Sequence, residues 1–294
     1  MNAPLEEALQ IPCGTSTMWA IASHPPRGVA TLPIAVLVVV GGPQYRVGSH
    51  RQFVSLARAL ARQGMTTVRF DYRGMGDSAG DLRSFEQVDA DIRAALSAMR
   101  TLCPTIERFV VWGLCDAAAA ALMFATSEST VAGIVAANPW ARSAATLGAV
   151  HVKHYYTHRL LEAAFWRKLL RGQVDWRQSA RSLVNNLRQM RSRRGAAHGQ
   201  SFQQRMADGL RRYEGELLLI ISGSDLTAME FLEYTRSANE WRGLLEARHV
   251  TRVDLPEADH TFSRRLWAEQ AEQATIQWVR RLAGAQPPTT NEAT

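Results

Sequence analysis

The chain has 294 residues, and 46% of them are hydrophobic, which is enough for a large buried core and argues against a disordered chain. Its three cysteines, Cys13, Cys103 and Cys115, are odd in number and far apart, so neither a disulfide framework nor a CxxC zinc site is indicated. The net charge of +7 is uneven, because residues 141–215 carry 15 Lys and Arg against four Asp and Glu, a local balance of +11. This excess indicates an inserted element that faces an anionic partner, or a solvated surface, and nucleic-acid binding is not expected.

The N-terminal segment MNAPLEEALQIPCG is acidic and lacks a basic start followed by an apolar run, so a secretory signal is not expected. The longest apolar run, IAVLVVV at 34–40, is too short to span a bilayer. Together these features predict a cytoplasmic protein without stable membrane insertion.

Apolar strands alternate with helical patterns along the chain. We expect strands at 35–40, 66–70, 108–112, 131–139, 215–225 and 248–256, and helices at 50–64 with Ser49 as N-cap, at 85–102, after 115, at 227–242 and at 263–282. This alternation predicts an α/β fold, a parallel sheet with helices on both faces. The expected parts are a core at 1–140, a basic helical insertion at 141–215, a second core part at 216–284 and a flexible tail at 285–294.

The stretch VVWGLCDAAA, residues 110–119, places Cys115 where a strand turns into a helix. A sharp turn there needs small residues on either side, and Gly113 and Ala117 occupy those positions. The pattern is typical of a G-x-S-x-G nucleophile turn with cysteine for serine and alanine for the second glycine. A helix N-terminus also stabilises a nearby thiolate. The alternative is an inert structural cysteine.

The order of the following residues favours the catalytic interpretation. Such a sheet carries an acid after the next-to-last strand and a histidine after the last one, where the sequence has Asp225 and His260. Asp225 could also be a helix cap, with Asp259 as a spare acid, and His260 could be a surface residue. The seven other histidines lie elsewhere, at positions 24, 50, 151, 154, 158, 198 and 249.

Four segments, GGPQYRVGSHRQF, FDYRGMGDSAGD, GLCDAAAAAL and ADHTFS, resemble those of the α/β-hydrolases over nearly the whole chain, and more closely the exosortase A system-associated hydrolase 1 family. That family is named for its gene neighbourhood, beside exopolysaccharide synthesis and protein-sorting genes. The resemblance implies an α/β-hydrolase fold, a mostly parallel sheet with a helical lid insertion. It also implies a triad of Cys115, Asp225 and His260, with the basic segment as the lid.

An oxyanion hole needs two N–H donors. One should be the backbone N–H of Asp116, the residue after the nucleophile, and the other should follow the strand at 35–40. Pro43 has no N–H, so the second donor is Gly42 or Gln44, depending on how the loop aligns; Gln44 also has a side-chain amide. Both positions could instead belong to an ordinary tight turn.

Tyr45 and Arg46 flank the expected pocket mouth and could bind an acidic substrate group, although a plain surface position is equally compatible. His151, His154 and His158 share one helical face, but no further ligands accompany them, so no metal is expected.

A Cys-His-Asp triad would attack an acyl carbonyl through sulfur and form a thioacyl enzyme. We therefore expect a hydrolase of esters or thioesters that acts on a small acyl substrate, including anionic ones, without a metal or organic cofactor. Acyl transfer by the same triad is an alternative, as is a non-catalytic binding module of the exopolysaccharide machinery. The sequence does not indicate an oligomeric state.

Overall fold

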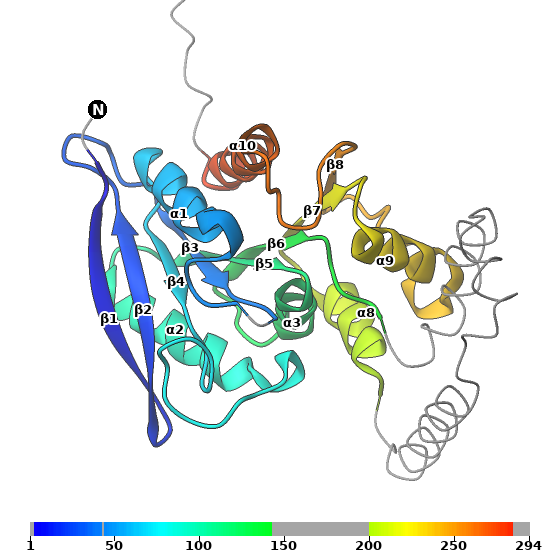
Figure 1. Cartoon of the computed structure of the whole chain (residues 1–294), viewed down its shortest axis with the longest axis horizontal. Coiled ribbons are helices and arrows are strands. Elements are labelled where there is room, and N and C mark those ends of the chain that lie inside the picture. The colour runs from blue at the N-terminus through cyan, green and yellow to red at the C-terminus, as the bar shows by residue number, and fades with distance from the viewer. Residues whose placement is uncertain (1–2, 43, 143–199, 285–294) are drawn as a thin grey trace, which may run out of the picture. The chain divides into compact units, whose positions relative to one another are not determined.

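The computed structural model describes residues 3–42, 44–142 and 200–284. These residues form an eight-stranded sheet in the order β1-β2-β4-β3-β5-β6-β7-β8 (Figure 1). The strands are β1 (Leu5–Cys13), β2 (Ser16–His24), β3 (Ile34–Val39), β4 (Thr67–Phe70), β5 (Arg108–Leu114), β6 (Val131–Ala137), β7 (Glu216–Ser222) and β8 (Val250–Leu255). All neighbours from β4 to β8 pair in parallel.

Two N-terminal strands that we did not predict, β1 and β2, extend the sheet. They form a hairpin, and β2 pairs antiparallel with β4. More than half of the residues in each strand are at least partly exposed, so the hydrophobic signal of these two strands is weaker than that of the buried central strands. The sheet is therefore mostly parallel with an antiparallel edge.

Helices cover both faces of the sheet. They are α1 (Gln52–Arg62), α2 (Asp89–Leu102), α3 (Asp116–Phe124), α8 (Phe202–Arg212), α9 (Leu226–Ser237) and α10 (Arg265–Leu282), with single 3₁₀ turns at Ser49–Arg51, Phe85–Gln87 and Asn239–Trp241. Helices α1 and α10 lie on one face, and α2, α3 and α8 lie on the other (Figure 1). Alternate residues of β3 enter the two cores: Ala35, Leu37 and Val39 face one, and Ile34, Val36 and Val38 face the other.

The start of α1 differs from the prediction. Ser49 is not its N-cap, because α1 begins at Gln52, after Arg51 in a left-handed conformation with φ 60°. His50 also has a positive φ, 53°, so two consecutive residues interrupt the helical backbone after Ser49. The Ser49 N–H donates instead to the side chain of Gln44 over 3.4 Å.

Helix α8 lies inside the range expected to be an insertion, but it belongs to the core. One compact unit comprises the chain up to Ala141 and from Phe202 onward. The buried side of α8, with Met206 and Leu210, joins the same hydrophobic core as α3. This burial corrects the expected end of the insertion from 215 to about Ser201. Most of that segment, 143–199, and the predicted tail at 285–294 lie outside the described residues.

Candidate active site

Cys115 stands at a strained turn between β5 and α3. Its backbone has φ 63° and ψ −121°, a combination that is costly for a residue with a side chain. A Cβ atom on Gly113 would come within 2.5 Å of the carbonyl group of Ala117, so only glycine fits there. The sharp turn predicted from the sequence is therefore present, and the small residues around it have a steric reason.

Backbone hydrogen bonds hold this strained turn. The N–H of Cys115 donates to the carbonyl oxygen of Ala137, at the end of β6, over 2.9 Å. The carbonyl oxygen of Cys115 accepts from Ala118 at 3.1 Å and from Trp140 at 3.0 Å. Because both backbone groups are paired, the neighbouring strand and the helix keep Cys115 in its unusual conformation.

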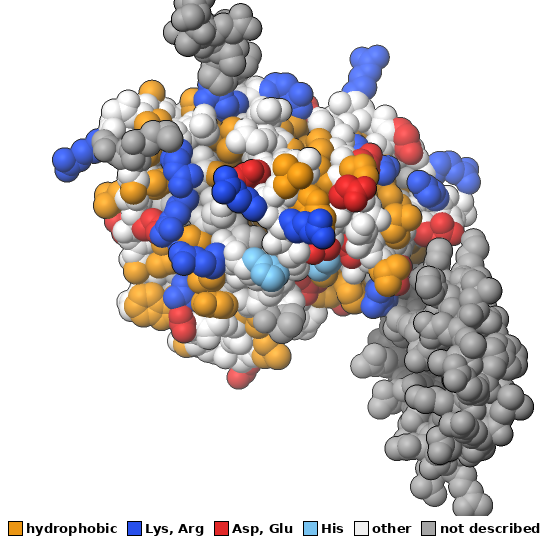
Figure 2. Space-filling model, turned by 45° about the horizontal axis from the view of Figure 1, so that its top comes forward, with side chains coloured by type: hydrophobic (Ala, Val, Ile, Leu, Met, Phe, Trp, Pro, Cys, Tyr) orange, Lys and Arg blue, Asp and Glu red, His pale blue; other side chains and the backbone are white. Residues whose placement is uncertain are grey.

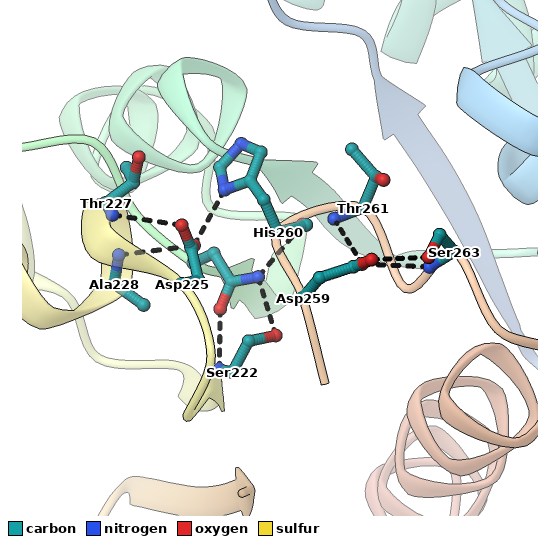
Figure 3. A network of polar contacts seen from close by, with 9 residues as sticks. Ser222, Asp225, Thr227, Ala228, Asp259, His260, Thr261 and Ser263 are labelled. Carbon is teal, nitrogen blue, oxygen red and sulfur yellow. Dashed lines mark hydrogen bonds and ion pairs between the residues drawn. The ribbon is translucent and has the colours of Figure 1, made fainter. Parts of the chain in front are cut away.

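Asp225 follows β7 and has two roles. Its carboxylate caps α9 by accepting from the N–H groups of Thr227 at 3.0 Å and Ala228 at 3.2 Å. The same carboxylate lies 2.7 Å from Nδ1 of His260 (Figure 3). The cap therefore orients the carboxylate toward the imidazole, and the helix cap considered from the sequence is present together with the contact to His260.

His260 lies between Asp225 and Cys115. Hydrogen bonds with Asp225 and then with Cys115 raise the pKa of His260 to about 10, although burial acts in the opposite direction. Its side chain is 31% exposed, so it can reach a bound molecule. The structure thus brings together Cys115, Asp225 and His260, which come from three separate connections at one edge of the sheet.

The spare acid, Asp259, has different partners. It accepts from the N–H groups of Thr261 at 3.3 Å and Ser263 at 2.9 Å (Figure 3). Although burial acts in the opposite direction, hydrogen bonds from Ser263 and Thr261 lower the pKa of Asp259. Its carboxylate stabilises the turn after β8 and does not contact the imidazole.

Sequence reasoning missed Asn138, which follows β6. Its Nδ2 donates to the carbonyl oxygen of His260 at 3.0 Å, and its Oδ1 accepts from the N–H of Ser222 at 2.8 Å. Asn138 is fully buried and has a φ of 42°, a conformation that asparagine adopts more readily than most residues. An asparagine directly after a buried strand was the available sequence signal.

The loop after β3 brings Gly42 to the turn at Cys115. Its N–H donates to Oδ2 of Asp116 over 3.0 Å. The side-chain oxygen of Gln44 instead accepts from Ser49 and, at 3.5 Å, from Nε2 of Gln52. Of the two expected donors, Gly42 is thus the one in hydrogen-bond contact with the turn, while the Gln44 side chain is bound within its own loop.

Arg46 and Tyr45 have different surroundings. Arg46 forms ion pairs with Asp71 and, at 2.6 Å, with Asp77, and its guanidinium lies 6.0 Å from the centre of the Tyr45 ring. Asp71 is fully buried and also accepts from the backbone N–H of Arg46 at 2.5 Å. The guanidinium of Arg46 is therefore bound to carboxylates of the protein and stabilises the loop, whereas Tyr45 is 46% exposed.

The described residues contain no group of three His, Cys, Asp or Glu side chains arranged to hold a metal ion. His151, His154 and His158 lie outside them. Among the residues that the structure describes, no helix is long and apolar enough to cross a membrane. On the face shown in Figure 2, Lys and Arg side chains are spread among hydrophobic and acidic ones and do not form a single basic patch.

A family model matches more than half of the chain. The model of the serine aminopeptidase S33 family covers residues 33–215, from just before β3 to the end of the loop after α8. The chain belongs to this family of hydrolases. For this S33-family member, the predictions of a hydrolase and of an α/β-hydrolase fold are therefore confirmed.

Solved structures share the fold of this S33-family member at low identity. An esterase from Pyrococcus furiosus is 16% identical with a TM-score of 0.62, over 95% of this chain and 93% of that one. An α/β serine hydrolase without a lid from Xanthomonas campestris is 18% identical with a TM-score of 0.59, over 96% and 97% of the two chains. A proline iminopeptidase from Mycobacterium smegmatis is 15% identical with a TM-score of 0.58, over 94% and 99%. A search among curated proteins found no match.

Proposed function

We propose that this protein hydrolyses a carboxylic ester or thioester, with Cys115 as the nucleophile, His260 as the acid and base, and Asp225 as the residue that orients His260. The observation that carries this proposal is the imidazole of His260, whose Nδ1 lies 2.7 Å from the Asp225 carboxylate and whose pKa is raised by its interactions with Asp225 and Cys115. A nucleophile, a base and an orienting acid within hydrogen-bond reach are what acyl transfer through a covalent intermediate requires.

In the first step the sulfur of Cys115 attacks the acyl carbon, and its proton lies on His260. The carbonyl oxygen becomes an oxyanion, for which the N–H groups of Gly42 and Asp116 are the proposed donors. The tetrahedral intermediate collapses, the alcohol or thiol leaves with the proton from His260, and the acyl group remains as a thioester on Cys115. Water then attacks this thioester and gives one proton to His260. The carbon–sulfur bond breaks, the acid is released, and the sulfur of Cys115 recovers its proton from His260.

The cysteine favours particular substrates. A thiolate is itself a good leaving group, so the tetrahedral intermediate returns to the reactants unless the substrate's own leaving group is weakly basic. Thioesters, enol esters and lactones meet this condition better than amides. The family's name refers to a serine enzyme that acts on peptides. The proposed enzyme differs from that name in two respects: its nucleophile is a cysteine, and the bond that it cleaves is an ester or thioester.

The biological setting is a separate part of the proposal. The resemblance to the exosortase A system-associated hydrolase 1 family supports a role beside exopolysaccharide synthesis. Acyl transfer to another acceptor would share the first step described above and differ only in the molecule that attacks the thioacyl enzyme. Identifying the released product, free acid or acylated acceptor, distinguishes the two reactions.

Intact mass spectrometry after incubation with acyl thioesters and aryl esters tests the proposal. We expect the mass of one acyl group on wild-type protein and on a Cys103→Ser control, and none on Cys115→Ala. An adduct that persists in Cys115→Ala would refute Cys115 as the nucleophile.

Alkylation provides a second test that needs no substrate. Iodoacetamide should modify Cys115 first, because burial raises the pKa of both Cys13 and Cys103 and disfavours their thiolates. Peptide mapping at short reaction times measures the order. Equal rates at the three cysteines would remove the argument for an activated thiol.

A further inference from the structure

The carboxylate of Asp116, the first residue of α3, lies between the Cys115 turn and the loop after β3. Its Oδ2 accepts from the N–H of Gly42 at 3.0 Å. Its Oδ1 packs so closely against Gly41 that a Cβ atom there would be 2.0 Å away. The same Cβ would lie 2.7 Å from the backbone nitrogen of Ala117. The absence of a side chain at Gly41 therefore leaves the space that the Asp116 carboxylate fills.

This carboxylate is poorly compensated. Oδ1 is buried, and none of the described residues donates a hydrogen bond to it. Burial raises the pKa of the Asp116 carboxyl, while the N–H groups of Gly42 and Ala117 and the charge of His260 act in the opposite direction. The carboxylate thus accepts the backbone N–H of Gly42, which is the kind of donor that an oxyanion needs.

The position creates a conflict with the proposed reaction. The N–H of Gly42 has one hydrogen, and Asp116 already accepts it. An acyl oxygen that becomes negative next to this carboxylate would meet a like charge and would lack one of its two donors. The resting arrangement is therefore incompatible with the tetrahedral intermediate.

We propose that Asp116 is a gate residue, whose side chain must turn away from Gly42 before an acyl carbonyl can bind beside Cys115. This inference rests on the proposed function. It assigns to Asp116 two opposite effects: its backbone N–H would stabilise the oxyanion, and its side chain would limit how often that donor pair is free. Acylation of the wild-type protein is then slower than the reactivity of the Cys115 thiol alone would allow.

Two variants distinguish the effect of the space that the Asp116 side chain fills from the effect of its negative charge. Asp116→Ser keeps the backbone donor but has a side chain too short to fill the space over Gly41. Asp116→Asn keeps the shape and removes the charge, so its amide oxygen can still accept from Gly42. We expect the order of acylation rates to be serine above asparagine above the wild-type aspartate.

The experiment measures two rates on each protein: acylation of Cys115 by p-nitrophenyl acetate, followed by intact mass, and alkylation of Cys115 by iodoacetamide. Alkylation forms a carbon–sulfur bond without an oxyanion. Its rate therefore shows whether the protein is folded and the Cys115 thiol is reactive, and it does not depend on the two N–H donors of the oxyanion hole. We expect Asp116→Ser to acylate at least about tenfold faster, the factor that loss of one charge-assisted hydrogen bond allows, with alkylation changed less than about twofold.

Other outcomes overturn the inference in distinguishable ways. If the wild type is acylated as fast as Asp116→Ser or faster, with alkylation unchanged, Asp116 does not obstruct the donors. Cys115 would still be the nucleophile in that case. Absence of any acyl adduct in wild type and in both variants, despite alkylation of Cys115, would reject both the gate and the proposed function.

Discussion

The side chain of Asn138 and the backbone of His260 are joined by a hydrogen bond of 3.0 Å across 122 residues of sequence. The same Nδ2 atom donates to the hydroxyl of Ser222 at 2.9 Å. Asn138 thus connects the ends of β6 and β7 with the loop that carries His260. Because the connection is to a backbone carbonyl, it fixes the position of His260 without limiting the protonation of the imidazole.

We predict that Asn138→Gly lowers kcat by about tenfold and leaves KM nearly unchanged. Glycine accepts the φ of 42°, so the change removes the hydrogen bonds without adding backbone strain. The buried Ser222 N–H then lacks its partner, which should cost roughly 1–3 kcal/mol of unfolding free energy. Steady-state kinetics and urea denaturation measure the two effects. A loss of stability with unchanged kcat would make Asn138 purely structural.

Substitutions at Asp225 can distinguish its role as the N-cap of α9 from the effect of its negative charge on His260. Asn is as good an N-cap as Asp, so Asp225→Asn should keep the helix cap and lose only the roughly 1–2 kcal/mol that the ion pair with protonated His260 contributes. Its amide would donate to Nδ1 of His260 and favour the wrong tautomer, so we expect kcat/KM to fall by roughly 100- to 10,000-fold. Asp225→Ala should lose the same activity and also about 1 kcal/mol of stability. Wild-type activity in the asparagine variant would contradict the assigned role.

The pKa of His260 predicts a dependence of stability on pH. The folded protein keeps the imidazole protonated up to about pH 10, whereas the unfolded chain releases this proton near pH 6.5. The stabilisation is therefore fully present below pH 6.5 and is lost as the pH rises toward 10. Partial exposure of the side chain screens the effect, so we expect about 1–2 kcal/mol.

Urea denaturation at several pH values, on wild type and His260→Gln, measures this contribution. The difference between the two proteins should shrink from neutral pH to pH 10. A difference that stays constant over this interval would show that His260 is not held protonated by Asp225 and Cys115.

Gly209 tests whether α8 belongs to the core. In an exposed helix, Gly→Ala stabilises by about 1 kcal/mol. Here a Cβ would stand 2.1 Å from the carbonyl oxygen of Leu122 on α3, so we expect Gly209→Ala to destabilise the protein by roughly 1–3 kcal/mol. Alanine at the exposed Gln277 of α10 serves as a control and should change stability by less than about 0.5 kcal/mol. A gain of stability in Gly209→Ala would indicate that α8 does not pack closely on α3.

Much of the core could be predicted from local pattern. Continuous apolar runs gave the central strands, because strands buried on both faces need no polar residues. The small residues around Cys115 indicated the sharp turn for a steric reason that the structure bears out at Gly113. The edge strands β1 and β2 could not be recognised in this way, because only part of each is buried.

The sequence by itself determined which residue types stand at which strand ends: Cys115, Asp225 and His260 follow the parallel strands β5, β7 and β8, and strand order along the chain brings such positions to one edge. Only the tertiary structure decided how Asp116, Asn138 and Arg46 are used. Their partners, Gly42, His260 and Asp71, lie between 25 and 122 residues away in the sequence. Contacts over such separations depend on how loops from different strands meet, and local propensity and periodicity carry no information about that.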